Sequence, residues 1–162
     1  SNAAGGLNPE YQVSDLMVIN DHINQHPENP LTGKNDSDVG IRFPDMSEPY
    51  DLELIEQAMT IAQKHGISTH QGVYVSVPGP NLETKAEYIY LRTIGADAVG
   101  MSTVPENIAA RHMDLPCFAI SVITDMGVPG QFKKVTIEEV IEAAARAEPG
   151  MTKIIKELIT QQ

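Results

Sequence analysis

The stretch DAVGMSTVPE, from Asp97 to Glu106, is the part of the sequence from which the fold is best predicted. Its apolar residues, at positions 98–101, form a short run that is typical of a buried strand. Thr103 and Glu106 have the spacing of a capping box, which marks the start of a helix. The stretch therefore predicts a strand that turns at Ser102 into a helix.

The start of this predicted helix is suited to an anion. The first N–H groups of a helix have no intrahelical partner and carry partial positive charge, so phosphate or carboxylate can bind there. The hydroxyl of Ser102 would add a further donor. Many capped strand-to-helix turns bind nothing, so an ordinary turn and an anion site both stay open at this point.

The rest of the chain alternates predicted strands with predicted helices. Strands are expected at 15–20, 72–77, 97–101 and 118–124, and helices at 51–65, 84–95, 103–113 and 136–159. Residues 1–8 are predicted to form a turn, residues 21–49 a long polar loop, and Pro149 a kink in the last helix. This alternation predicts an α/β fold with a largely parallel sheet and helices on both faces.

In such sheets, ligands bind beyond the carboxyl ends of the strands. Three predicted strand ends carry polar side chains, at 78–83, 101–103 and 124–125. Glu83 can accept hydrogen bonds from N–H groups of a ligand, or it can serve as an ordinary charge before a helix. Asp125 can face a ligand, or it can form a turn into the glycine-containing loop that follows it.

The composition excludes several classes of function. The formal net charge is -11, from 11 Lys and Arg against 22 Asp and Glu, which argues against nucleic acid as a partner. No apolar run is long enough for a membrane span. Cys117 is the only cysteine, which excludes an internal disulfide, and a cytoplasmic location is expected. His22 and His26 lack the pattern of a metal site, so no metal is expected.

Several segments also carry distinctive motifs. They are NAAGGLN at 2–8, DHIN at 21–24, NPL at 29–31, RFPDMS at 42–47, GVYV at 72–75, GP at 79–80 and ADAVGMSTVPE at 96–106. In this order they closely resemble the trimeric purine nucleoside phosphorylases, the family that includes methylthioadenosine phosphorylase. The resemblance extends over essentially all of the 162 residues.

The resemblance implies a phosphorylase-like three-layer α/β fold with a largely parallel central sheet. It implies phosphorolysis of purine nucleosides to free purine and ribose 1-phosphate, as in purine salvage, by a pentosyltransferase that forms a homotrimer. No metal or organic cofactor is implied, since inorganic phosphate is the co-substrate. Residues 1–162 would be the C-terminal portion of a single domain, with the N-terminal part missing.

The resemblance also implies roles for individual residues. Phosphate would bind Ser102 and the backbone of Ala3. The implied purine and ribose contacts are Tyr74 and Met101 for ribose, Leu82 and Val99 beside the base, Glu83 at purine N1, Asp125 near N7 and the 6-substituent, and Ile137 near the sugar 5′ position. Glu83 and Asp125 would be the catalytic residues.

Four positions depart from the family pattern. Asp125 replaces a usual Asn, Leu82 and Val39 replace aromatic residues, and Ile137 replaces a histidine. A 6-oxopurine nucleoside is the leading substrate, while an ionised carboxylate at position 125 would suit a 6-amino group. An adenosine or methylthioadenosine phosphorylase therefore stays open as an alternative.

The family's upstream half, which carries further phosphate ligands and several strands, has no counterpart in this sequence. The chain is therefore expected to be inactive alone and to associate through an exposed apolar sheet edge. A non-catalytic purine-binding module is a third alternative.

Overall fold

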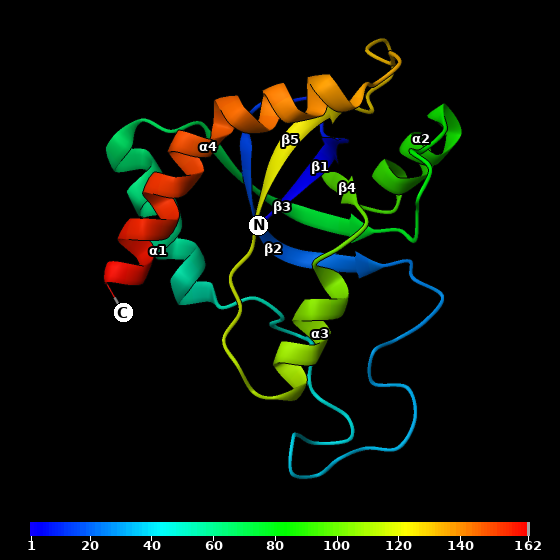
Figure 1. Cartoon of the computed structure of the whole chain (residues 1–162), viewed down its shortest axis with the longest axis vertical. Helices are drawn as coiled ribbons and strands as arrows, with labels where there is room; N and C mark the ends of the chain where they lie inside the picture. Colours follow the sequence, from blue (N-terminus) through cyan, green and yellow to red (C-terminus); the bar gives the residue numbers. More distant parts are fainter. Residues whose placement is uncertain (162) are drawn as a thin grey trace.

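The computed structural model describes residues 1–161, and Figure 1 shows its strands and helices. The strands are β1 (Asn2–Gly6), β2 (Leu16–Asn24), β3 (Thr69–Ser76), β4 (Ala98–Gly100) and β5 (Ile120–Met126). The helices are α1 (Leu52–His65), α2 (Lys85–Thr93), α3 (Val104–His112) and α4 (Ile137–Thr160). The predicted alternation of strands and helices from β2 to α4 is confirmed.

The five strands form a closed barrel in the order β1-β4-β3-β2-β5. The pairs β1–β5, β2–β3 and β3–β4 are parallel, whereas β1–β4 and β2–β5 are antiparallel. The α/β class is confirmed, and the sheet is more mixed than the alternation alone indicated. Because every strand has two hydrogen-bonded neighbours, the expected exposed sheet edge is wrong for the described residues.

The reason is β1, which closes the barrel where the sequence predicted only a turn. Its glycines favour a turn when they are considered locally. In the structure they allow a close crossing, because a Cβ at Gly6 would lie 2.7 Å from the sulfur of Met126 and one at Gly5 would lie 3.3 Å from Asp125 Oδ2. A side chain at Gly6 would therefore displace Met126 or Ile123 of β5, and one at Gly5 would make a tighter contact with Asp125 than is usual.

The four helices surround the barrel (Figure 1). Helix α4 crosses β5 and packs beside α1, while α3 lies against β2. Helix α2 packs separately through Tyr88 and Leu91, which form a second apolar cluster with residues of β3 and β4. Helix α4 includes Pro149, and Figure 1 shows the helix changing direction between its orange and red parts, as the predicted kink requires.

The start of α3 differs from the prediction. Thr103 has a positive φ of 71°, and its side chain makes no capping bond. Its hydroxyl instead accepts a hydrogen bond from Nδ2 of Asn2 at 2.7 Å. The predicted capping box is therefore wrong, because a contact with the first strand, 101 positions away in sequence, takes the threonine hydroxyl.

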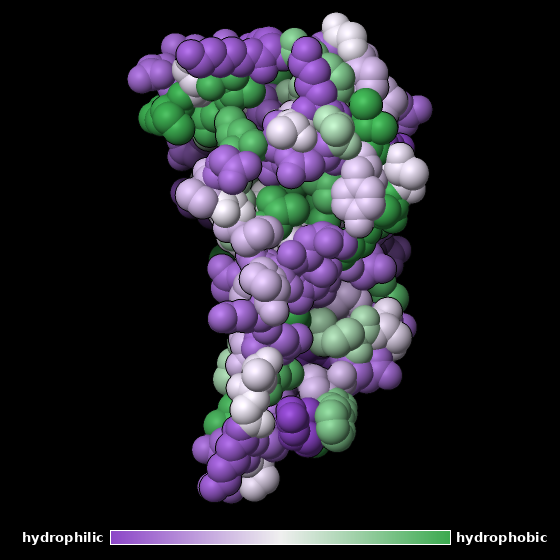
Figure 2. Space-filling model, turned by 90° about the vertical axis from the view of Figure 1, so that its right-hand side faces the viewer, coloured by the Kyte–Doolittle hydropathy of each residue, from purple (hydrophilic) through white to green (hydrophobic). Residues whose placement is uncertain are grey.

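The predicted loop begins later than expected, since β2 continues through residues 21–24 by pairing with β3. Figure 1 shows the remaining segment, drawn in blue to cyan, projecting below the barrel and α3. In Figure 2 the same end of the molecule is a narrow extension under a broader upper part, where apolar and polar side chains alternate over the surface. Within residues 1–161, no helix combines the length and apolar character that crossing a membrane needs.

Candidate active site

One cavity of about 470 Å³ brings together two of the predicted strand ends. It lies between the start of α2, the end of β5 and the loop before α4. Glu83 and Leu82 reach it from the turn after β3, and Asp125 reaches it from β5. Tyr88 of α2 and Phe132 of the loop complete its aromatic wall. The predicted catalytic pair, Glu83 and Asp125, therefore shares one cavity.

Burial dominates the electrostatics of this pair. Asp125 is 8% exposed, and its burial raises the pKa of the carboxyl above the ordinary value. The hydroxyl of Thr124 donates to Asp125 Oδ1 at 3.1 Å, which acts in the opposite direction. Burial also raises the pKa of Glu83, and the charge of Asp125 adds to that effect. In such surroundings the neutral form of each carboxyl is less disfavoured than it is in water.

The predicted ribose-binding residues, Tyr74 and Met101, are not among the residues that line this cavity. Tyr74 of β3 is fully buried, and its hydroxyl accepts a hydrogen bond from the backbone N–H of Ser102 at 3.3 Å. Burial raises the pKa of Tyr74, so its phenol stays protonated near neutral pH. Met101 lies against the turn after β3, because a Cβ at Gly79 would come 2.3 Å from the methionine sulfur.

The predicted phosphate-binding serine lines a different cavity, of about 440 Å³, at the start of α3. Ser102 shares it with Thr103, Glu106 and the buried Asn107, whose Oδ1 has no hydrogen-bond partner in the described structure. None of the described residues that line this cavity is a Lys, Arg or His. Ala3 lies in β1, two residues before Gly5, and pairs with Val122 of β5.

The other predicted site residues differ in their burial and in whether they line the cavity of the carboxyl pair. Val99 of β4 is buried in the apolar cluster that includes Leu7 and Tyr88. Ile137 is the first residue of α4, with 71% of its surface exposed, and it is not among the residues that line the cavity of Glu83. Leu82 lines that cavity but is 53% exposed.

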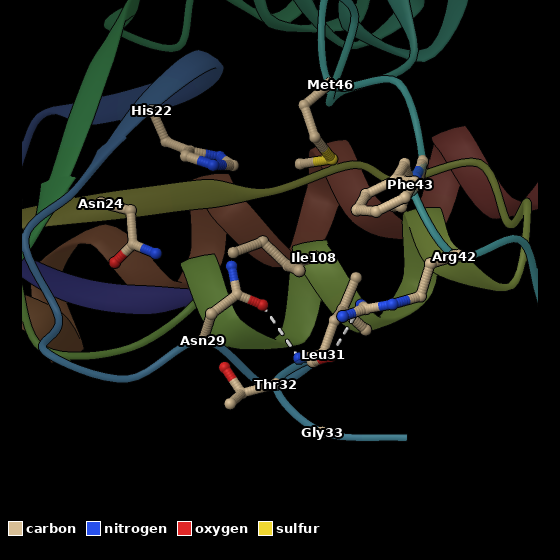
Figure 3. A pocket seen from close by; sticks show the side chains of 11 residues that line it. His22, Asn24, Asn29, Leu31, Thr32, Gly33, Arg42, Phe43, Met46 and Ile108 are labelled. Atoms are coloured by element: carbon tan, nitrogen blue, oxygen red, sulfur yellow. Dashed lines mark hydrogen bonds between the residues drawn. The ribbon is translucent and has the colours of Figure 1, made fainter. Parts of the chain in front are cut away.

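A third cavity, of about 530 Å³, was not predicted from the sequence. Figure 3 shows it between the end of β2, α3 and the long loop. Leu31, Met46 and Ile108 supply apolar walls, and the guanidinium of Arg42 lies 5.1 Å from the ring centre of Phe43. The length of the loop was the one signal for it, since loops this long often carry function.

Comparisons of the sequence with protein families and with single proteins identify similar proteins. A sequence model described as "Phosphorylase superfamily" matches residues 1–160. Purine nucleoside phosphorylase 1 of Bacillus subtilis is 45% identical over 161 residues, which are 99% of this chain and 59% of that protein. Purine nucleoside phosphorylase of Bos taurus is 44% identical over 166 residues, with 98% of this chain and 57% of that protein covered.

Solved structures of purine nucleoside phosphorylases are also similar to this chain. A schistosome purine nucleoside phosphorylase in complex with hypoxanthine superposes with a TM-score of 0.93 at 38% identity, covering 98% of this chain and 59% of that chain. The Schistosoma mansoni enzyme in complex with inosine gives a TM-score of 0.93 at 36% identity, with 99% and 59% covered. The present chain thus spans less than two thirds of the length of these relatives.

Proposed function

The chain belongs to the phosphorylase superfamily, and we propose that the protein acts as a purine nucleoside phosphorylase. The reaction is phosphorolysis of a purine nucleoside to free purine and ribose 1-phosphate. The proposal depends mainly on one cavity, which is lined by Glu83, Asp125 and the buried Tyr88. The pKa of each of the two carboxyls is raised. Relatives at 44–45% identity are named purine nucleoside phosphorylases, which supports the assignment.

The departing purine gains electron density, so groups that donate to it stabilise the transition state. In the proposed arrangement, ionised Glu83 accepts a hydrogen bond from N1–H of a 6-oxopurine. The neutral carboxyl of Asp125 donates to N7, where charge develops as the glycosidic bond breaks. Tyr74 and Met101 contact the ribose, and the attacking phosphate binds near Ser102 and the backbone of Ala3.

The second candidate function is phosphorolysis of adenosine or methylthioadenosine. Asp125 favours it, because an ionised carboxylate at this position would accept from a 6-amino group. The raised pKa of Asp125 favours the 6-oxopurine instead, since the neutral form can donate. Initial rates with inosine and with methylthioadenosine separate the two candidates, and a clear preference for inosine would exclude the second.

The proposal includes no metal or organic cofactor and no nucleic acid, with phosphate as co-substrate. It also includes a homotrimer and a cytoplasmic location, the latter supported by the single cysteine. Because the cavity beside Ser102 lacks a basic side chain among the described residues, we propose that phosphate needs groups beyond those residues.

The test measures phosphate-dependent release of hypoxanthine from inosine. The complete protein that carries this chain should release hypoxanthine, and Ser102→Ala should lower the rate at least tenfold through loss of a phosphate contact. The 162-residue chain should bind hypoxanthine in a calorimetric titration yet release none above its Ser102→Ala control.

Three results would contradict parts of this proposal. Release by the 162-residue chain would show that the described residues suffice for phosphate binding. If neither hypoxanthine nor methylthioadenosine gave heat at millimolar concentration, purine binding itself would be contradicted. If the complete protein bound purine without catalysing the reaction, it would be a purine-binding module.

A further inference from the structure

The backbone of Ser102 is held by two side chains of β3. Its N–H donates to the hydroxyl of Tyr74 at 3.3 Å, and its carbonyl oxygen accepts from the hydroxyl of Ser76 at 3.0 Å. Tyr74 and Ser76 are two residues apart in a strand, so both side chains lie on the same face. Strand β3 pairs with β4 so that Ser76 lies opposite Gly100, two residues before Ser102. The position of Ser102 therefore depends on β3.

Further contacts leave the Ser102 backbone little freedom. A Cβ at Gly100 would lie 2.2 Å from the hydroxyl oxygen of Tyr74, so the glycine gives that hydroxyl room to reach Ser102. The carbonyl oxygen of Ser102 also accepts from the N–H of Val104 at 2.8 Å, which occupies its second lone pair. Tyr74 and Ser76 are both fully buried, so their bonds to Ser102 are shielded from water.

The hydroxyl of Ser76 has a further partner, His26, in the loop that follows β2. The Nε2 atom of His26 lies 2.7 Å from the hydroxyl oxygen of Ser76. A hydroxyl carries one hydrogen, and Ser76 donates it to the carbonyl oxygen of Ser102, which has no hydrogen of its own. The Ser76 oxygen therefore accepts from His26, which requires a hydrogen on Nε2. The hydrogen bonds thus run in one direction, from His26 through Ser76 to Ser102.

The backbone brings His26 to Ser76. Strands β2 and β3 are parallel, with Asn24 opposite Ser76 at their ends, and Figure 1 shows their arrowheads at the same edge of the barrel. The N–H of Gln25 donates to the carbonyl oxygen of Ser76 at 2.9 Å. The N–H of His26 donates to Oδ1 of Asn24 at 2.9 Å, which forms an Asx turn. The half-buried imidazole is therefore held at the end of β3 by the main chain as well as by its ring.

We propose that His26 is a positioning residue for Ser102 and that it acts through the hydroxyl of Ser76. This inference rests on the proposed function, in which Ser102 contacts the attacking phosphate. A serine that is held in place before the anion arrives loses less conformational freedom on binding, so it binds the anion more tightly. The bond from His26 stabilises the orientation in which Ser76 donates to the Ser102 carbonyl. In this arrangement His26 itself does not contact phosphate.

The first test detects the hydrogen bond directly and needs no substrate. An imidazole N–H that is hydrogen-bonded exchanges slowly with water, so it gives a proton resonance coupled to ¹⁵N. Spectra of the ¹⁵N-histidine-labelled 162-residue chain are recorded for the wild type and for His26→Gln, Ser76→Ala and Glu28→Ala. One such resonance should be absent from both His26→Gln and Ser76→Ala. It should remain in Glu28→Ala, which changes an exposed side chain of the same loop.

Two outcomes of this measurement would overturn the inference. One is a wild type without a slowly exchanging N–H from His26, and the other is a His26 resonance that survives in Ser76→Ala. Because Ser76 is fully buried, circular dichroism first establishes that Ser76→Ala is folded. Should it not fold, the comparison of His26→Ala with His26→Gln described next decides the matter.

The second test measures phosphorolysis of inosine by the complete protein, with phosphate and inosine varied separately. His26→Ala should raise the KM for phosphate about three- to tenfold, the range of one lost hydrogen bond, and leave the KM for inosine within about twofold. His26→Gln should restore the KM for phosphate, because the glutamine amide can donate to Ser76 as Nε2 does. Glu28→Ala is the matched control and should equal the wild type. A KM for phosphate as high in His26→Gln as in His26→Ala would contradict the inference.

A double variant separates an indirect effect from a direct one. Because His26 acts through Ser76, His26→Ala should not raise the KM for phosphate further in a Ser76→Ala background. A further rise of the same size would show that His26 contacts phosphate itself, and it would refute the positioning role. Equal rises for phosphate and inosine in His26→Ala would indicate a merely structural role and would also refute it.

Failure of the proposed function would look different. If the complete protein released no hypoxanthine, the phosphorylase assignment would be contradicted. The imidazole resonance would then decide by itself whether His26 is joined to Ser102 through Ser76.

Discussion

At the scale of single residues, Asp125 combines a buried position with a carboxyl of raised pKa. It ends a buried strand, and its carboxyl lies beside the first strand, where a Cβ at Gly5 would lie 3.3 Å from Oδ2. Burial raises the pKa of this carboxyl because a charge loses its hydration there. The same property that suits Asp125 to donate a proton makes its ionised form costly to the fold.

We predict that Asp125→Asn stabilises the fold at alkaline pH. Because the folded-state pKa of Asp125 is raised, the wild type loses stability as the pH rises through that value. Asn has nearly the same shape, carries no charge and can accept the bond from Thr124. The free energy of unfolding should rise by on the order of 1 kcal/mol at pH 8.

Urea unfolding at pH 8 and at pH 4 checks this prediction. Below the unfolded-state pKa, near 3.9, both states of the wild type are protonated, so the gain should shrink as the pH falls towards it. A loss of stability at pH 8 would show that an ionised Asp125 is favourably paired.

At the scale of elements, helix α2 positions the candidate site through its first turn. Thr84 and Glu87 form a complete capping box, in which the side chain of each residue accepts a hydrogen bond from the backbone N–H of the other. The sequence predicted this box, and a matching one at Thr136 and Glu139 of α4 is also present. Both boxes involve residues only three positions apart, which is why local sequence was sufficient.

We predict that Thr84→Ala lowers the free energy of unfolding by about 1 kcal/mol, because the N–H of Glu87 loses its acceptor. Thr84→Ser keeps a hydroxyl at the cap and should remain close to the wild type. Urea denaturation of the three proteins at pH 7 measures both effects. Equal stability of the alanine and serine variants would show that the cap contributes little to this helix.

At the scale of the whole molecule, the barrel and the helices share one large apolar core. Residues of β2, β5, α1, α3 and α4 contribute to it. Ile154, in the second half of α4, is fully buried in that core, whereas Ile159 on the same helix is 68% exposed. The docking of α4 beside α1 therefore depends on a few buried residues beyond the bend at Pro149.

We predict that Ile154→Ala lowers the free energy of unfolding by about 3 kcal/mol, from lost burial and the cavity left behind. Ile159→Ala, the matched control, should change it by less than about 0.5 kcal/mol. Thermal and urea unfolding of both variants test the prediction. Similar losses in the two variants would mean that helix propensity, and not core packing, determines the stability of α4.

The sequence by itself determined the features that depend on neighbours within a few positions. These are the strand and helix alternation, the caps at Thr84 and Thr136, the end of α1 at Gly66, and the placement of Glu83 and Asp125 at strand ends. Its motifs also determined the family, which the comparisons confirm.

Only the tertiary structure decided how β1 closes the barrel, why the hydroxyl of Thr103 turns to Asn2, and that Tyr88 lines the cavity of Glu83 and Asp125. Each depends on residues far apart in sequence that meet through packing. Gly6, for example, pairs with Ala98 and Met126 of two other strands, and a Cβ there would lie 2.7 Å from the sulfur of Met126. A pattern of neighbouring residues cannot report such a contact, because the free energy that fixes it comes from burial in the assembled core.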